Sequence, residues 1–407
     1  MMMIAIAESA IASPALVQQD LYFGLSLSNN KTISRPEFQD FLDDVITPRF
    51  ASGLTQFDGK GQLPEQSGVQ EATNVVSLYA PDTLENQLSL KQIARAYQQA
   101  FDISVVQVTN KDDLKIGFGP GENLIDNDPI PELIQVDLFF GRNIGGTVGV
   151  TQEQFQAFVD QTITPRFPLG LTNFDANGQF LSSDGTLVRE PAEVVSLIIE
   201  DTEANEAAID AIVSEYKQQF QQESVLIAVN EAITVAFGPT ADLIDNDLIP
   251  EPIQVDLFFG RNMGGVEGVS EAEFQTFLQD VVDPYFDQFT VLDADGQFLS
   301  NTGDLIRERS KTVSLIIEDT VANEAAINHV VSEYIARFQQ ESVLVVVDEE
   351  IQVNFINNLP IGCGDGFREM GYNNLPYPPF ASGQPFRVED CFGSGDRNFN
   401  ALWSGLM

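Results

Sequence analysis

Apolar residues recur along the chain in two alternating patterns, one typical of short strands and one typical of helices. The run Val136–Phe140 is apolar and leads into a Gly/Asn turn, which predicts a strand. After it, apolar residues fall three or four positions apart, which places them on one face of a helix. Two such stripes comprise Phe38, Phe41, Leu42, Val45 and Ile46, and Phe274, Phe277, Leu278, Val281 and Val282.

A capping box predicts where this helix begins in three places along the chain. In such a box a hydroxyl side chain and the residue three positions later bond to each other's backbone N–H groups. A proline then ends each helix. The boxes are Ser34…Glu37, Thr151…Gln154 and Ser270…Glu273, and the prolines are Pro48, Pro165 and Pro284.

The whole pattern occurs three times. The run IQVDLFFGRN stands at 134–143 and again at 253–262, and VSLIIEDT stands at 195–202 and 313–320. A diverged first copy begins near Asp20, which lies 117 residues before Asp137, while Asp256 lies 119 residues after it. A spacing this long is that of whole domains in series rather than of solenoid repeats.

Each copy has the same predicted order of elements. Strand and helix are followed by a short strand, an Asp/Asn-Gly turn, a buried strand, a second helix and two final strands. The turns are Asp175–Gly178 and Asp293–Gly296, the second helix of copy two buries Ile209, Ile212, Val213, Tyr216 and Phe220, and its final strands are Val225–Val229 and Ile233–Phe237. The order βαββαβ plus an extra strand predicts an α+β fold of three tandem ferredoxin-like domains. In each, the helices cover one face of a mainly antiparallel sheet.

These patterns give predicted domain boundaries. They are an N-terminal segment 1–18, repeat 1 at 19–121, a linker 122–133, repeat 2 at 134–240, a linker 241–252, repeat 3 at 253–357 and an irregular tail 358–407. The tail contains both cysteines, Cys363 and Cys391, which we expect to form a disulfide, with two free thiols as the alternative.

The charge balance is strongly acidic, with 61 Asp and Glu against 20 Lys and Arg and a net charge of −41. Such a surface repels phosphate backbones and anionic membranes, which argues against nucleic-acid binding. It suits solubility in a salty or extracellular setting, or attraction of Ca²⁺ or a basic protein partner. No apolar run is long enough to predict a membrane-spanning helix. The first residues lack the basic region of a signal peptide, and the disulfide expectation favours an extracellular or periplasmic location over the cytoplasm.

The motifs of copies two and three, taken in order, resemble the bacterial domain of unknown function (DUF) 3574. They are DLFFGR at 137–142, TPRFPLGLT at 164–172, D-x-x-G-Q at 175–179 and Val-Arg-Glu at 188–190. Copy one departs from them, since Leu25 stands where the others have Arg142 and Arg261. The resemblance implies a shared fold. It supplies no activity and no catalytic residues.

Few residues are suited to catalysis or to binding a metal or ligand. His329 is the single histidine, which removes most histidine-dependent enzymes and zinc sites. Arginines near a strand end can hold a carboxylate or phosphate, or can simply pair with nearby acids. The candidate catalytic set is Asp137, Arg142, Arg166 and Tyr216, and the candidate ligand-binding arginines are Arg142, Arg189, Arg261 and Arg307.

A calcium loop is the weaker alternative at the acidic turn, with Asp175, Asn177 and Asp184 as candidate ligands. A hairpin turn explains the same residues. No sequence feature indicates a cofactor. The sequence therefore favours a non-catalytic binding or structural protein whose domains pack on each other or on a partner. The alternatives are an enzyme acting on a small organic anion in a sheet-lined pocket of repeat 2, and a Ca²⁺-responsive surface protein.

Overall fold

The computed structural model describes most of the chain up to residue 356. The described residues are 16–27, 31–62, 71–110, 114–117, 119–121, 124–125, 130–144, 147–181, 185–240, 243–244, 249–263, 266–299 and 304–356. The two cysteines, Cys363 and Cys391, lie outside them. Within these ranges the fold is α+β, with six α-helices and one large, antiparallel sheet system shared by three repeats.

Each repeat contributes four strands of its own to the sheet. In repeat 1 these are β1 (Leu16–Gly24), β2 (Gly53–Gln62), β3 (Glu71–Pro81) and β4 (Val105–Asn110). The strand β1 pairs with β3 and β4, and β3 pairs with β2, all antiparallel, so the order is β4-β1-β3-β2.

Repeats 2 and 3 have the same order. In repeat 2 it is β11-β6-β10-β9, and in repeat 3 it is β18-β13-β17-β16. The bounds are β6 (Leu133–Gly141), β9 (Gly170–Leu181), β10 (Leu187–Glu200), β11 (Leu226–Asn230), β13 (Pro252–Gly260), β16 (Phe289–Leu299), β17 (Leu305–Glu318) and β18 (Leu344–Asp348). Two short hairpins follow the first strands of these repeats, β7 (Asn143–Ile144) with β8 (Thr147–Val148) and β14 (Asn262–Met263) with β15 (Val266–Glu267).

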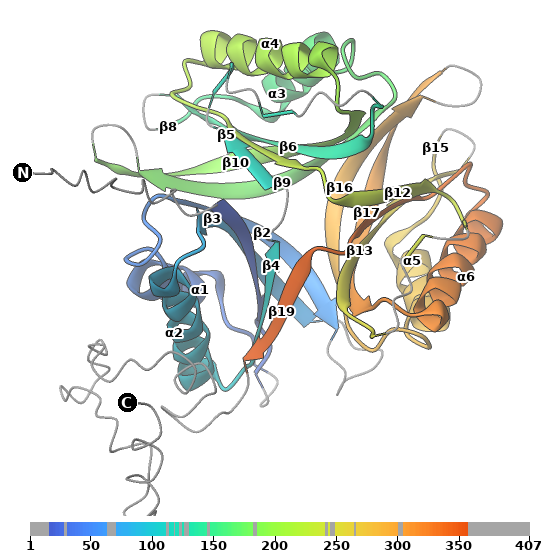
Figure 1. Ribbon diagram of the computed structural model, residues 1–407, viewed down its shortest axis with the longest axis horizontal. Helices are drawn as coiled ribbons and strands as arrows, with labels where there is room; N and C mark the ends of the chain where they lie inside the picture. The colour runs from blue at the N-terminus through green and yellow to red at the C-terminus, as the bar shows by residue number, and fades with distance from the viewer. Residues whose placement is uncertain are drawn as a thin grey trace, which may run out of the picture. The chain divides into compact units, whose positions relative to one another are not determined.

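Two helices per repeat cover one face of each sheet, as Figure 1 shows for α3 and α4 beside β6 and β10. The first helices are α1 (Arg35–Phe41), α3 (Gln152–Phe158) and α5 (Glu271–Phe277), and all three capping boxes are present as expected. The second helices are α2 (Leu84–Phe101), α4 (Glu203–Phe220) and α6 (Val321–Phe338). The predicted apolar face of α4 is buried, which confirms the helical pattern.

A π-helical turn extends each first helix, at Leu42–Ile46, Val159–Ile163 and Leu278–Val282. In each, a backbone N–H bonds five residues back, as Thr47 does to the carbonyl of Leu42 at 2.8 Å. Such turns are rare and insert one residue into the helix. Their recurrence in all three repeats shows that they belong to the fold.

The extra strand of each repeat leaves its own sheet and pairs with the next repeat. The strand β5 (Leu114–Gly117) of repeat 1 pairs with β11 of repeat 2, and β12 (Ile233–Phe237) of repeat 2 pairs with β18 of repeat 3. The strand β19 (Ile351–Ile356) of repeat 3 pairs with β4 of repeat 1 (Figure 1). Each repeat therefore gives a strand to the sheet of the next one, and repeat 3 gives a strand to repeat 1, so the exchange forms a closed cycle.

The strands β2, β9 and β16 also pair with one another and close a second cycle. The first half of β2 pairs with the second half of β9, the first half of β9 with the second half of β16, and the first half of β16 with the second half of β2. Two cycles of main-chain pairing therefore join the repeats, and residues up to Phe355 form one unit.

The predicted turns at Asp175–Gly178 and Asp293–Gly296 are wrong, because both segments lie inside the continuous strands β9 and β16. Gly178 pairs on one side with Glu190 of its own repeat and on the other with Thr55 of repeat 1. A partner strand from another repeat therefore holds in extended form a sequence that, read alone, is typical of a turn.

Candidate functional site

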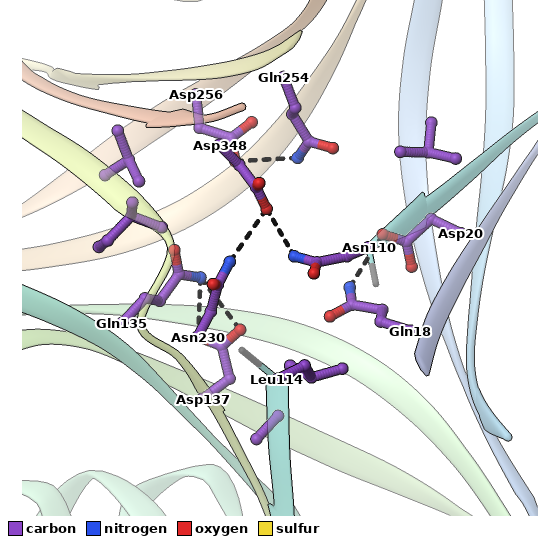
Figure 2. Close-up of a pocket in the computed structure, with 14 residues that line it drawn as sticks. Gln18, Asp20, Asn110, Leu114, Gln135, Asp137, Asn230, Gln254, Asp256 and Asp348 are labelled. Carbon is purple, nitrogen blue, oxygen red and sulfur yellow. Dashed lines mark hydrogen bonds between the residues drawn. The ribbon is translucent and has the colours of Figure 1, made fainter. Parts of the chain in front are cut away.

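A polar pocket lies where the sheets of the three repeats face one another. It has a volume of about 50 Å³ and is lined by corresponding residues of each repeat. The lining side chains shown in Figure 2 include Gln18 and Asp20 of β1, Gln135 and Asp137 of β6, Gln254 and Asp256 of β13, and Asn110, Asn230 and Asp348 at the ends of the fourth strands. We call it the central pocket.

The carboxyl groups of the central pocket are bonded to amide and hydroxyl donors. Asp20 accepts hydrogen bonds from Ser77 Oγ at 2.5 Å and from Gln18 Nε2 at 2.9 Å. Asp348 Oδ2 accepts from Asn110 Nδ2 at 2.5 Å and from Asn230 Nδ2 at 3.0 Å (Figure 2). The two bonds to Asp348 join repeat 3 to repeats 1 and 2.

Burial raises the pKa of each of these carboxyl groups, because a charged form loses its hydration there. The pKa rises to about 6 for Asp20, Asp137 and Asp348, and also rises for Asp256. Hydrogen bonds from Ser77 and Gln18 offset part of the rise at Asp20. None of the fourteen lining residues is Lys or Arg. The pocket can therefore hold protons and a few water molecules, but it is too small for an organic ligand.

Two larger cavities lie between consecutive repeats, on the sheet face that the helices cover. The cleft between repeats 1 and 2 has a volume of about 420 Å³, and the cleft between repeats 2 and 3 has a volume of about 280 Å³. Each is walled by the first helix of the earlier repeat and floored by strands of both repeats. We call them the 1/2 cleft and the 2/3 cleft.

Equivalent side chains hold the two clefts together. In the 1/2 cleft, Arg189 of repeat 2 donates to Gln179 at 2.9 Å and pairs with Asp43 of repeat 1 at 2.5 Å. In the 2/3 cleft, Arg307 donates to Gln297 at 3.1 Å and pairs with Asp160 of repeat 2 at 2.8 Å.

The acids of these pairs, Asp43 and Asp160, stand in the π-helical turns. The next residue after each turn also reaches across, since Thr47 bonds Gln179 and Thr164 bonds Gln297 at 2.9 Å. The π turns therefore supply contacts that join one repeat to the next.

The junction between repeats 3 and 1 carries charged residues at the corresponding positions. Lys311, which is 2% exposed, pairs with Glu271 at 2.8 Å and with Asp293 at 2.5 Å. Glu271 also pairs with Lys60 of repeat 1 at 2.9 Å. Burial alone would raise the pKa of Glu271, but the bonds and charges of Lys311 and Lys60 outweigh it and lower the pKa to about 2. Ion pairs therefore help to hold this junction together.

The candidate catalytic residues do not converge. Asp137 lines the central pocket, whereas Arg142 bonds to Gln152, to the carbonyl of Val150 and to Glu193 at 3.1 Å. On β10, Glu193, which contacts Arg142, lies three residues from Ser196, which stands opposite Asp137. An odd spacing sends side chains of a strand to opposite faces.

The other two members of that set are engaged elsewhere. Arg166 pairs with Glu215 at 2.5 Å. Tyr216 is buried and donates its hydroxyl to the carbonyl of Gly141 at 2.8 Å. The equivalent residues Tyr97 and Tyr334 make the same bond to Gly24 and Gly260, so this tyrosine ties the second helix to the end of the first strand in every repeat.

The remaining candidates also have defined places. Arg261 donates to the carbonyl of Val269 at 2.8 Å. Asp175 and Asn177 stand two apart on the strand β9, and Asp184 lies outside the described residues. In the described part of the chain, no group of three or more His, Cys, Asp and Glu residues is arranged to hold a metal ion. None of the described helices combines the length and the apolar character needed to cross a bilayer.

Sequence reasoning missed Glu193, which is fully buried beside Arg142. Burial raises the pKa of Glu193 to about 7, although Asn173 and Arg142 partly offset the rise. The corresponding residue is Asn74 in repeat 1 and Lys311 in repeat 3, so three different chemistries occupy one buried position. The sequence feature that could have identified this residue is an acid, Glu193, inside an otherwise apolar strand.

The family model described as protein of unknown function (DUF3574) matches the chain three times, at residues 18–116, 135–237 and 254–355. The chain belongs to this family. The three matches establish the three tandem copies of the DUF3574 domain, including the diverged first copy. No curated protein and no solved structure shows significant similarity to the DUF3574 chain.

Proposed function

We propose that this DUF3574 chain is a binding protein whose three domains act as one unit and hold small polar ligands in the 1/2 and 2/3 clefts. The observation that carries the proposal is the pair of clefts itself. They lie at equivalent junctions, each is built by two repeats, and the volume of the larger one is typical of a small-molecule site.

The lining of the 1/2 cleft suits a polar ligand. Five amide side chains line it, together with two arginines and an apolar wall from α1. Amides can both donate and accept hydrogen bonds, and a guanidinium holds carboxylates in a fixed geometry. The amide residues are Gln39, Gln56, Asn74, Asn177 and Gln179, and the arginines are Arg35 and Arg189.

A binding role is better supported than a catalytic one because the candidate catalytic side chains serve the fold. Tyr216 and Arg166 are bonded within repeat 2, and Asp137 faces a pocket too small for an organic substrate. Arg189 and Arg307 pair across the junctions. Their guanidinium groups therefore lie at the clefts, held in place by the acids of the preceding repeat.

We also propose that each repeat is a ferredoxin-like domain. The strand order β4-β1-β3-β2, its two counterparts, and two helices on one face support this assignment. The exchanged strands β5, β12 and β19 are additions to that pattern. The pairing of β2 with β9 and of β9 with β16 builds the floors of the two clefts.

The proposal is tested by thermal-shift screening of the full chain against organic acids, amino acids and sugars, with hydrogen exchange to locate each hit. We expect ligands to raise the melting temperature and to protect α1 with β10, or α3 with β17. Asn177→Trp and Asp295→Trp should each fill one cleft and abolish the shift from its ligand. Asp175→Trp, on the same strand as Asn177 but outside both clefts, should leave both shifts unchanged. Ligand protection confined to a single repeat would contradict the proposal.

A further inference from the structure

The floor of the 2/3 cleft is a polar surface built from three strands. The strand β9 lies beside β16, which lies beside β17, with Asn173 opposite Asp295 and Gln297 opposite Arg307. Because side chains alternate along a strand, residues two apart face the same side. Asn173, Asp295, Gln297, Arg307 and Arg309 therefore share one face, and all five line the cleft.

Two buried polar atoms on this floor have no hydrogen-bond partner among the described residues. They are Oδ1 of Asn173 and Nε2 of Gln297, in side chains that are 8% and 5% exposed. The other ends of both side chains are held, since Asn173 donates to Glu193 at 2.7 Å and Gln297 accepts from Thr164 at 2.9 Å. A buried donor or acceptor without a partner costs stability unless something bonds to it.

The corresponding glutamine of the 1/2 cleft is satisfied. Gln179 donates through Nε2 to Thr47 at 3.0 Å and accepts from Arg189 at 2.9 Å. The amide of Gln56, which stands where repeat 2 has Asn173, donates to Asn74. The unpartnered acceptor and donor are thus specific to the 2/3 cleft within this pair of clefts.

The charged residues of the floor follow the same order as these two atoms, with an acid opposite the acceptor residue and an arginine opposite the donor residue. Asn173, whose Oδ1 is the unpartnered acceptor, stands opposite Asp295 in the strand register. Gln297, whose Nε2 is the unpartnered donor, stands opposite Arg307 and accepts a hydrogen bond from its Nε at 3.1 Å. The two ends are two residues apart along β16, about 7 Å. An acceptor with a negative charge at one end and a donor with a positive charge at the other complement a zwitterion.

We propose that the 2/3 cleft binds a free amino acid, with its carboxylate at Gln297 and Arg307 and its ammonium group at Asn173 and Asp295. This inference rests on the proposed function and names the ligand class of one of its two clefts. Arg309 stands opposite Asp295 and also lines the cleft. The cleft volume of about 280 Å³ accommodates an amino acid with a small or medium side chain.

The test is calorimetric titration of the full chain with L-alanine, propionate and ethylamine, followed by a panel of larger amino acids. Alanine contains both charged groups, whereas propionate and ethylamine each contain one. We expect an amino acid of the panel to bind, and the matched acid and amine to bind at least about 10-fold more weakly, because each loses one set of charge-assisted bonds.

Matched variants locate the site. Gln297→Glu keeps the shape of the side chain and removes the donor, so it should weaken amino-acid binding about 10-fold or more. Gln179→Glu makes the same change in the 1/2 cleft and should leave the affinity unchanged. Asp295→Asn, at an exposed position, should also weaken binding, and it covers the case in which Gln297→Glu does not fold.

Equal binding of the amino acid and its matched acid would overturn the zwitterion assignment while leaving the proposed function intact. So would equal weakening by Gln179→Glu and Gln297→Glu, or no binding by any amino acid when other library compounds bind. Failure of every library compound at both clefts would reject the proposed function as well.

Discussion

Single residues decide how the three repeats, which share one order of elements, differ at their junctions. One buried position carries Asn74 in repeat 1, Glu193 in repeat 2 and Lys311 in repeat 3. The amide and the acid lie at the two clefts, whereas the lysine forms ion pairs with Glu271 and Asp293. A buried charge requires a partner, so the side chain at this position determines which neighbours it pairs with.

The acids of the central pocket make the fold sensitive to pH. Asp20 is 8% exposed, and burial, with the charges of Asp137 and Asp256, raises its pKa from 3.8 to about 6 against the bonds from Ser77 and Gln18. The folded state then binds a proton more tightly than the unfolded state does. The stability that this proton supplies is complete below about pH 4 and is lost as the pH rises through 6.

Asp20→Asn should therefore stabilise the protein at pH 8 by up to about 3 kcal/mol, since each unit of pKa shift corresponds to about 1.4 kcal/mol. The gain should shrink to below about 1 kcal/mol at pH 4, where Asp20 is protonated in the folded state and partly protonated in the unfolded state. Urea unfolding at the two pH values measures it. Asp287→Asn, at an exposed position, controls for the general loss of one negative charge. Equal gains for Asp20→Asn at both pH values would refute the assignment.

At the scale of elements, the boundaries that depend on local sequence were predictable and those that depend on another repeat were not. The capping boxes and the apolar face of α4 involve residues within a few positions of each other, and both were found as expected. The strand β12 lies at the predicted residues Ile233–Phe237, but its partner is β18, more than a hundred residues away. No local pattern encodes such a partner.

Gly178 tests this interpretation of β9. In a hairpin turn it would need a positive φ, where alanine is strained. In the strand a Cβ would make ordinary van der Waals contacts, with Ala192 at 3.6 Å and the carbonyl oxygen of Glu190 at 3.9 Å. We expect Gly178→Ala to be neutral or to stabilise by about 0.5 kcal/mol, through lower entropy of the unfolded chain. Gly185→Ala, at a φ of 81°, should instead lose about 1 kcal/mol. Thermal unfolding of both variants distinguishes the cases, and similar losses at both sites would favour a turn at Gly178.

The candidate site was also only partly predictable from the sequence. The sequence identified Arg189 and Arg307 as arginines that could bind a ligand, and both line a cleft. It could not show that the cleft belongs to two repeats, because the opposite wall comes from a helix about 150 residues earlier in the chain. The central pocket was equally hidden, since Asp20, Asp137 and Asp256 meet only when the strand exchange is complete.

At the scale of the whole molecule, two cycles of strand pairing predict that the repeats unfold together. The strand β5 completes the sheet of repeat 2, β12 that of repeat 3 and β19 that of repeat 1. Loss of one repeat would therefore leave a sheet edge unpaired in each neighbour. Independent tandem domains would lose only their own structure.

Ile212→Ala, in the core of repeat 2, measures this coupling. Ile212 is fully buried on α4, and truncating such a side chain costs about 2–5 kcal/mol. If unfolding is cooperative, the full chain keeps a single calorimetric transition at a lower temperature, and hydrogen exchange accelerates in the slowest amides of all three repeats alike. Ile249→Ala, at a 75% exposed position, should change neither measurement. Faster exchange confined to repeat 2, or a transition that splits in two, would mean that the strand exchange joins the repeats without coupling their stability.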